Sequence, residues 1–206
     1  MVRTQPAILI ADDHSMIRKG LKLYLQLSLN YSDISEAGTC SELMNELVKR
    51  KYTHLVLDLI LSDGSALEVI PNIRRVYPDL HIMIFSMQPP EVYGEALRTY
   101  GIQYYLSKTA GEEDIIQALQ RFIENQSLKK ANGGILQSEN PFSALAPREL
   151  EILHYVLKGI GTKQIAETLS LKMSTISTLK TRIFEKTNAG NIKELIELAS
   201  LYNVNY

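Results

Sequence analysis

The feature that most constrains the fold is an alternation of two residue patterns over the first 125 residues. Short apolar runs rich in β-branched residues, typical of buried strands, recur with stretches of helical periodicity between them. Strict alternation of strands and helices predicts a doubly wound α/β fold, in which helices cover both faces of a five-stranded parallel sheet. The five expected strands are 7–11, 34–37, 54–58, 81–86 and 102–106.

Apolar residues spaced three or four positions apart place the expected helices between these strands. Leu21, Leu25 and Leu29 fall on one helical face, which predicts a helix that packs on the sheet. Ser41 is the expected N-terminal cap of the second helix, and Thr162 that of a helix in the C-terminal region.

The chain changes character after the α/β region. Polar residues and glycines dominate residues 126–142, which we interpret as a linker after a domain formed by residues 1–125. Residues 143–206 are expected to be wholly helical, and Pro147 suits the first turn of a helix. A tight turn precedes the helix expected over 174–187. Two helices joined by such a turn predict a helix-turn-helix within an all-α four-helix domain.

Composition and charge narrow the class of protein. Of the 206 residues, 45% are hydrophobic and 22% are charged, as in an ordinary globular chain. The longest apolar run near the start, Pro6 to Ala11, is too short for a membrane span or a secretory signal. The one cysteine, Cys40, excludes an internal disulfide framework and a Cys-based zinc site. We therefore expect a cytoplasmic protein that makes no membrane contact.

The two regions differ in the sign of their charge. Residues 1–125 carry 12 Lys and Arg against 16 Asp and Glu, whereas residues 141–206 carry 8 against 6. An acidic N-terminal region and a mildly basic C-terminal region fit two domains with different partners.

Charged and hydroxyl side chains stand where the expected strands end. Asp12 and Asp13 follow the first strand, and Asp58 ends the third. Ser86 ends the fourth strand, and Lys108 follows the fifth. In an open parallel sheet these ends meet in one crevice, where ligands bind. Because three carboxylates so close together repel one another, the sequence predicts a site for a hard divalent cation, Mg²⁺.

Each of these side chains has a chemical role if the crevice handles phosphate. Asp58 is the expected nucleophile toward phosphorus, which gives an acyl phosphate. Asp13, supported by Asp12, is expected to hold the Mg²⁺ that neutralises charge on the transferring group. Ser86 is expected to donate to one phosphoryl oxygen and Lys108 to pair with another. Singly, such residues are common as helix caps, loop carboxylates or surface lysines, but their joint occurrence at four strand ends favours a functional site.

The stretches ILIADDHSMIRKGL, LVLDLILSDGSALEVI, IMIFS and GIQYYLSK also carry a family resemblance. Through them, residues 3–125 resemble the receiver domain of a two-component response regulator. The resemblance implies that Asp58 is the phosphoacceptor. It also implies that Mg²⁺ is bound by Asp58, by the acidic pair Asp12 and Asp13, and by the backbone carbonyl of Ile60.

The same resemblance implies a switch made of Ser86, Tyr105 and Lys108, in which Tyr105 turns inward when Ser86 moves toward the phosphoryl group. The alternative for Tyr105 is a plain half-buried strand aromatic. Two positions depart from the family pattern: Ile60 stands where a polar or Met residue is common, and Met87 where Ala or Gly follows the switch serine. We hypothesise that these side chains wall the site and slow hydrolysis of the acyl phosphate; ordinary sequence drift is the alternative.

The stretch LAPRELEILHYVLKGIGTKQIAETLSLKMSTISTLKTRIFEKTNAGNIKELIELA resembles the LuxR-type DNA-binding domain. The resemblance implies that 174–187 is a recognition helix lying in the major groove, with Ile176 and Ile183 on its inward face. Arg148 and Glu149 are expected to be internal tethers, and a four-helix docking domain is the alternative. The expected contacts to base edges are Ser177, Thr178 and Thr181. The expected contacts to phosphate are Lys163, Lys172, Lys180, Arg182 and Lys186.

Together these features predict a response regulator of the NarL/FixJ class, and not an enzyme. A sensor histidine kinase is expected to phosphorylate Asp58 with Mg²⁺, and phosphorylation to control dimerisation and the binding of a homodimer to promoter DNA. Two alternatives stay open: a DNA-binding regulator that works through protein contacts alone, and a phosphohydrolase with Asp58 as its nucleophile. Against the second, Ile60 stands where such enzymes usually have a second acid.

Overall fold

The computed structural model describes residues 5–125 and 140–204. Residues 126–139 of the expected linker lie outside the described residues. The described residues form two compact units, one of residues 5–87 with 100–125, and one of 88–99 with 140–204.

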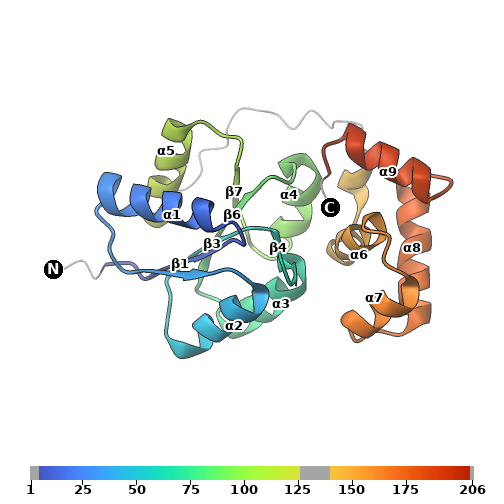
Figure 1. Ribbon diagram of the computed structural model, residues 1–206, viewed down its shortest axis with the longest axis horizontal. Helices are drawn as coiled ribbons and strands as arrows, with labels where there is room; N and C mark the ends of the chain where they lie inside the picture. Colours follow the sequence, from blue (N-terminus) through green and yellow to red (C-terminus); the bar gives the residue numbers. More distant parts are fainter. Residues whose placement is uncertain (1–4, 126–139, 205–206) are drawn as a thin grey trace. The chain divides into compact units, whose positions relative to one another are not determined.

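The first unit is built on a five-stranded parallel sheet, as the alternating sequence pattern predicts (Figure 1). The strand order is β2-β1-β3-β6-β7, so that the winding of the chain reverses between β1 and β3. A short antiparallel hairpin, β4 (Ile60–Leu61) and β5 (Gly64–Ser65), follows the central strand. The sheet strands are β1 (Ile8–Ala11), β2 (Ile34–Ala37), β3 (His54–Leu57), β6 (His81–Ser86) and β7 (Tyr104–Ser107).

Helices cover both faces of this sheet. Figure 1 shows α1 and α5 over one face and α2 and α3 over the other. The helices are α1 (Ser15–Leu23), continued by the π-helical turn η1 (Tyr24–Ser28), α2 (Cys40–Lys49), α3 (Ala66–Val76) and α5 (Glu112–Ile123).

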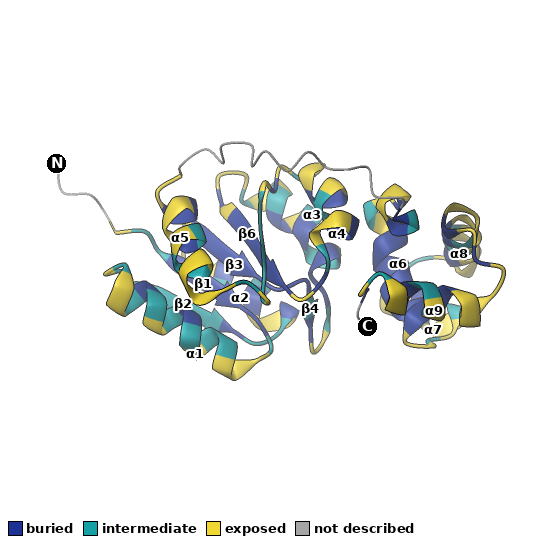
Figure 2. Ribbon diagram, turned by 90° about the horizontal axis from the view of Figure 1, so that it is seen from above, coloured by how far each residue is buried: buried dark blue, intermediate teal, exposed yellow. Residues whose placement is uncertain are grey.

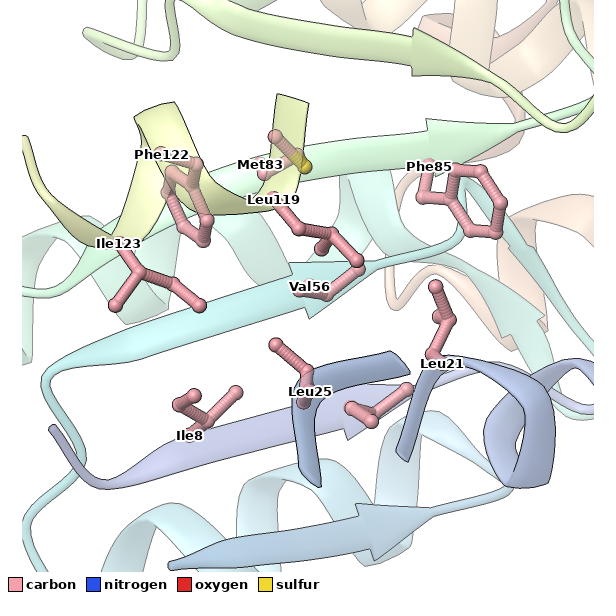
Figure 3. Packing of buried hydrophobic residues seen from close by; sticks show 10 residues of the cluster. Ile8, Leu21, Leu25, Val56, Met83, Phe85, Leu119, Phe122 and Ile123 are labelled. Atoms are coloured by element: carbon pink, nitrogen blue, oxygen red, sulfur yellow. The ribbon is translucent and has the colours of Figure 1, made fainter. Parts of the chain in front are cut away.

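Alternate strand residues form the core beneath α1 and α5. Ile8, Val56 and Met83 point to this face of the sheet because side chains alternate along a strand, and they meet Leu25 and Phe122 from the helices (Figure 3). The inner strands β1, β3 and β6 are buried from both sides, as Figure 2 shows for the middle of the sheet, whereas the edge strands β2 and β7 are mostly half-buried. The core thus fixes the register of the strands, and with it the positions of the residues at their ends.

Two helix caps differ from those expected. Helix α2 begins one residue before Ser41, and its cap is Thr39, whose side chain accepts a hydrogen bond from the backbone N–H of Glu42 at 3.0 Å. Thr39 is extended, whereas Ser41 is already helical and its hydroxyl bonds elsewhere. In the second unit, Thr162 is the first helical residue and Gly161 occupies the cap position without a side chain to accept a bond.

The second unit contains the expected helix-turn-helix. Helices α6 and α7 both pack against α8, and α9 packs against α6. The turn between α7 and α8 is closed by a hydrogen bond from Leu171 N–H to the Ala166 carbonyl at 2.9 Å. Phe142, assigned to the linker from sequence, is fully buried in the turn η2. The elements are α4 (Pro90–Arg98), the 3₁₀ turn η2 (Pro141–Ala144), α6 (Pro147–Leu157), α7 (Thr162–Thr168), α8 (Met173–Thr187) and α9 (Ile192–Leu201).

Within the described ranges, no helix has both the length and the apolar character that crossing a membrane requires.

Candidate functional site

The polar residues of the expected crevice stand at one end of the sheet. Asp12 directly follows β1 and Asp58 directly follows β3, and backbone bonding continues past the strand, since Asp58 N–H donates to the Ala11 carbonyl at 2.9 Å. Lys108 follows β7 in the same way, donating its N–H to the carbonyl of Ser86 at 3.0 Å. The regular ladder of the parallel sheet therefore sets the spacing between these residues.

Their side chains form one buried cluster around Asp58. Lys108 Nζ lies 2.5 Å from Asp58 Oδ2 and 2.6 Å from Asp12 Oδ2. Ser86 Oγ donates to Asp58 Oδ1 at 2.6 Å. The side chains of Asp12, Asp58 and Lys108 are only 2%, 6% and 4% exposed, so water contributes little to their solvation.

Burial controls the protonation of this cluster. It raises the pKa of Asp58, even though the bonds from Lys108 and Ser86 act in the opposite direction. Burial also acts to lower the pKa of Lys108, but the bonds to Asp12 and Asp58 outweigh it, so the pKa of Lys108 is raised and the ammonium stays charged. Asp12 and Asp58 share the ammonium of Lys108, and Asp13 adds a third carboxylate to the group, so a bound cation would offset the repulsion among the three.

The same end of the sheet offers ligands of the kind that Mg²⁺ prefers. Asp12, Asp13 and Asp58, together with His14, each offer one ligand atom, and these atoms lie within 4.8 Å of one another. Asp13 is the most accessible carboxylate, with 27% of its side chain exposed. Hard carboxylate oxygens at this spacing fit Mg²⁺. Ile60, whose carbonyl is the further expected ligand, is in β4, where its N–H lies 3.5 Å from Asp58 Oδ1.

Two residues beside the acidic pair hold it in place. His14 is at the rim, as its place after the pair indicates, with its Nδ1 2.7 Å from Asp13 Oδ1. Its backbone N–H donates to Asp12 Oδ1 at 2.8 Å. Sequence reasoning missed Arg18, whose Nη1 donates to the Asp12 backbone carbonyl at 2.5 Å and whose Nε lies 3.4 Å from Glu36 on β2. The available signal was a cation one helical turn after His14.

The switch residues lie on neighbouring strands. Tyr105 pairs in register with Ile84, two positions before Ser86 on β6. Tyr104 packs its ring against Phe122 of α5, with centroids 5.1 Å apart, so alternation along β7 directs Tyr105 to the opposite face. Tyr105 is half-buried on that face.

The proposed apolar wall has one half-buried and one exposed member. Ile60 is half-buried, whereas Met87 is 51% exposed. The wall stays a hypothesis, and the half-life of the phosphoryl group in an Ile60→Asn, Met87→Ala double variant tests it: a half-life as long as that of the wild type would contradict it.

Helix α8 exposes the face expected to read DNA. Ile176 and Ile183 are buried, whereas Ser177, Thr178 and Thr181 are exposed. The Thr178 and Thr181 hydroxyls donate to carbonyls one turn back, at 2.9 and 3.1 Å, which leaves their oxygens outward as acceptors.

The cations around α8 are not equivalent. Lys163, Lys172 and Arg182 are exposed, whereas Lys180 Nζ donates to Thr162 Oγ1 at 3.4 Å. Lys186 Nζ lies 2.6 Å from Glu149 Oε2 and donates to the Ala144 carbonyl at 3.1 Å. Lys186 therefore bonds within the domain although its side chain is 38% exposed.

Comparison with known proteins covers both units. The family described as "Response regulator receiver domain" matches residues 8–120, and the family described as "Bacterial regulatory proteins, luxR family" matches residues 143–199. The "Oxygen regulatory protein NreC" of Staphylococcus carnosus is 29% identical over 207 residues, covering 93% of this chain and 95% of that protein. NreC of Staphylococcus aureus strain MRSA252 is 28% identical over the same shares of the two chains.

Solved structures with the same fold include RcsB from Salmonella enterica serovar Typhimurium. RcsB bound to promoter P1flhDC in the presence of phosphomimetic BeF₃⁻ has a TM-score of 0.83 at 24% identity, over 96% of this chain and 100% of that one. RcsB bound to promoter rprA has a TM-score of 0.77 at 23% identity, over 96% and 99%.

Proposed function

Since the chain belongs to the response regulators of the NarL/FixJ type, with a receiver domain and a LuxR-type helix-turn-helix, we propose that phosphorylation of Asp58 with Mg²⁺ controls its binding to promoter DNA. The observation that carries this proposal is the buried cluster in which Asp58 contacts both Ser86 and Lys108 beside two further carboxylates. A structural ion pair needs one carboxylate for one ammonium, whereas this cluster has an excess of acid.

The transfer step follows from the position of Asp58. A carboxylate oxygen of Asp58 attacks the phosphorus of a phosphohistidine on a sensor kinase; a P–O bond forms, the P–N bond breaks, and the imidazole leaves. Asp12, Asp13, Asp58 and the Ile60 carbonyl would hold Mg²⁺, and the ion would neutralise negative charge on the carboxylates and the transferring phosphoryl group. Lys108 and Ser86, which now bond the two oxygens of Asp58, are placed to bond phosphoryl oxygens after the transfer.

The output step follows from the same two side chains. When Ser86 moves toward the phosphoryl group, it vacates space on the face of the sheet to which Tyr105 belongs. Inward rotation of Tyr105 then changes the outer surface of β7 and favours a homodimer. A dimer reads two DNA half-sites, so dimerisation raises the affinity for DNA. RcsB, which shares the fold, is found bound to promoters in the presence of phosphomimetic BeF₃⁻, and this supports a link between phosphorylation and DNA binding.

Helix α8 is the proposed recognition helix. Thr178 and Thr181 are proposed to accept hydrogen bonds from base amino groups, together with Ser177. The proposed phosphate contacts are Lys163, Lys172, Lys180, Arg182 and Lys186. Glu149 competes with phosphate for the ammonium of Lys186, whose side chain is 38% exposed.

Phosphate-affinity electrophoresis after incubation with acetyl phosphate tests the proposal. We expect a shifted band for the wild type with Mg²⁺, no shifted band for Asp58→Ala, and a normal shift for the control Asp79→Ala, which changes an exposed aspartate. The phosphorylated wild type should also bind promoter fragments more tightly than Asp58→Ala. Absence of the shift in the wild type would favour a regulator controlled by protein contacts alone, and repeated turnover of a phosphate ester would favour a phosphohydrolase.

A further inference from the structure

The loop after Asp58 contains a hairpin that is too short to be stable on its own. Its strands β4 and β5 have two residues each, with the pairs Ile60–Ser65 and Leu61–Gly64. A hairpin of this size has little stability of its own and depends on what it contacts. Because Ile60 is also an expected metal ligand, the contacts of the hairpin matter for the site.

One end of the hairpin is fastened to helix α3. Ser65 caps α3: its hydroxyl accepts from Leu67 N–H at 3.3 Å, and its N–H donates to Glu68 Oε1 at 3.2 Å. The N–H of Ala66 donates to the Leu59 carbonyl at 2.8 Å. These bonds fix where β5 ends but not where the tip of the hairpin points.

The tip is fastened by Asp63 to helix α2, a different element. Its carboxylate accepts from Cys40 N–H at 2.6 Å, Ser41 N–H at 3.0 Å and Ser41 Oγ at 2.9 Å. Burial acts to raise the pKa of Asp63, but the bonds from Ser41 and Cys40 outweigh it, so the pKa is lowered and the carboxylate is ionised. Charged bonds to N–H groups at a helix N-terminus are among the stronger hydrogen bonds in proteins.

Helix α2 has an N-terminal cap besides Asp63. Thr39 accepts from Glu42 N–H at 3.0 Å, and Glu42 Oε2 accepts from Gly38 N–H at 2.6 Å. These bonds do not reach the N–H groups of Cys40 and Ser41, which Asp63 satisfies. The bonds of Asp63 therefore complete the first turn of α2 and at the same time hold the hairpin tip against it.

We propose that Asp63 is a positioning residue for phosphorylation: by fastening the hairpin tip to α2, it holds the Ile60 carbonyl where Mg²⁺ is bound. The inference rests on the proposed function of Asp58. It predicts a specific defect, in which loss of Asp63 weakens Mg²⁺ binding, while saturating Mg²⁺ restores the rate because the bound ion then holds the hairpin.

The test measures the rate of phosphorylation by acetyl phosphate as a function of Mg²⁺ concentration. For Asp63→Ala we expect the Mg²⁺ concentration at half-maximal rate to rise about tenfold, the lower end of the effect of losing an outer partner of a metal site, with an unchanged maximal rate. Ser41→Ala, which removes one of the three bonds, should give a smaller shift in the same direction.

Thr39→Ala is the matched control. It removes a side-chain acceptor from the same turn of α2 but leaves the hairpin bonds in place. A midpoint in Thr39→Ala displaced as far as in Asp63→Ala, or a wild-type midpoint in Asp63→Ala, would overturn the proposal. If Asp63→Ala fails to fold, the Ser41→Ala midpoint decides alone, and a wild-type value overturns the proposal. Failure of the wild type to become phosphorylated at any Mg²⁺ concentration would instead remove the proposed function itself.

Discussion

The two units of the molecule both bury charged side chains, but they balance them differently. In the first unit, Asp12 and Asp58 share the ammonium of Lys108, and Asp13 lies beside them with its carboxylate 2.7 Å from His14 Nδ1. In the second, each buried carboxylate has a cation of its own: Glu149 lies 2.6 Å from Lys186, and Glu151 lies 2.6 Å from Arg148.

The difference in charge balance distinguishes a functional site from a structural ion pair. A buried pair with equal charges is complete and joins two segments, as Glu149 and Lys186 join α6 to α8. A buried cluster with excess negative charge is incomplete, because repulsion among its carboxylates persists until a cation arrives. We therefore assign chemistry to the first cluster and stability to the second.

Breaking the pair of Glu149 and Lys186 should lower stability more than any other single change discussed below. Lys186→Met leaves Glu149, which is 3% exposed, without its cation; because the side chain of Lys186 is itself 38% exposed, we expect the free energy of unfolding of the second unit to fall by about 1–2 kcal/mol. Urea denaturation followed by circular dichroism measures this loss. Lys193→Met is the matched control, because Lys193 is 84% exposed and its removal should change little. Equal stability of the two variants would contradict a structural role for the pair of Glu149 and Lys186.

Acid should destabilise both units, because each of them contains a buried histidine. Burial, with Lys158 as a lesser cause, lowers the pKa of His154 to about 4, and burial, with His81 as a lesser cause, does the same for His54. Since an unfolded histidine titrates near 6.5, the unfolded chain binds more protons between about pH 6.5 and 4. Stability is therefore full above pH 6.5 and falls as the pH decreases toward 4, by at most about 1.4 kcal/mol per pH unit for His154.

Denaturation of the second unit at several pH values measures this slope. His154→Leu should flatten the slope of that unit between pH 6.5 and 4, and leave the His54 contribution in the first. A slope that His154→Leu leaves unchanged would place its source elsewhere.

In the cluster of Asp12, Asp13 and Asp58, removing a charge should raise stability, whereas removing the charge of Lys186 lowers it. Without divalent cations, Asp13→Asn relieves repulsion and should stabilise the first unit by roughly 0.5–1 kcal/mol, the modest size expected for a carboxylate that is 27% exposed. Added Mg²⁺ should stabilise the wild type and not this variant. Thermal unfolding with and without Mg²⁺ measures both effects; destabilisation by Asp13→Asn in the absence of Mg²⁺ would mean that the cluster is balanced after all.

Sequence could predict the members of the site but not what holds them. Asp12, Asp58 and Lys108 are visible because each follows an apolar run, and the ends of parallel strands meet. The bond of Asp63 to Ser41 joins residues 22 positions apart, and the pair of Lys186 with Glu149 joins residues 37 apart. Such contacts depend on how elements pack, which no local pattern specifies. Lys186 was accordingly expected to contact phosphate, although its local sequence gives no sign of a buried partner.

The most direct test of the central claim is fluorine NMR of the full chain with beryllofluoride, a mimic of the phosphoryl group, titrated with Mg²⁺. If Asp58 accepts the phosphoryl group with Mg²⁺, bound-fluoride signals should appear only when Mg²⁺ is present and should be absent in Asp58→Asn. Bound signals that persist in Asp58→Asn, or no bound signal in the wild type at saturating Mg²⁺, would contradict it.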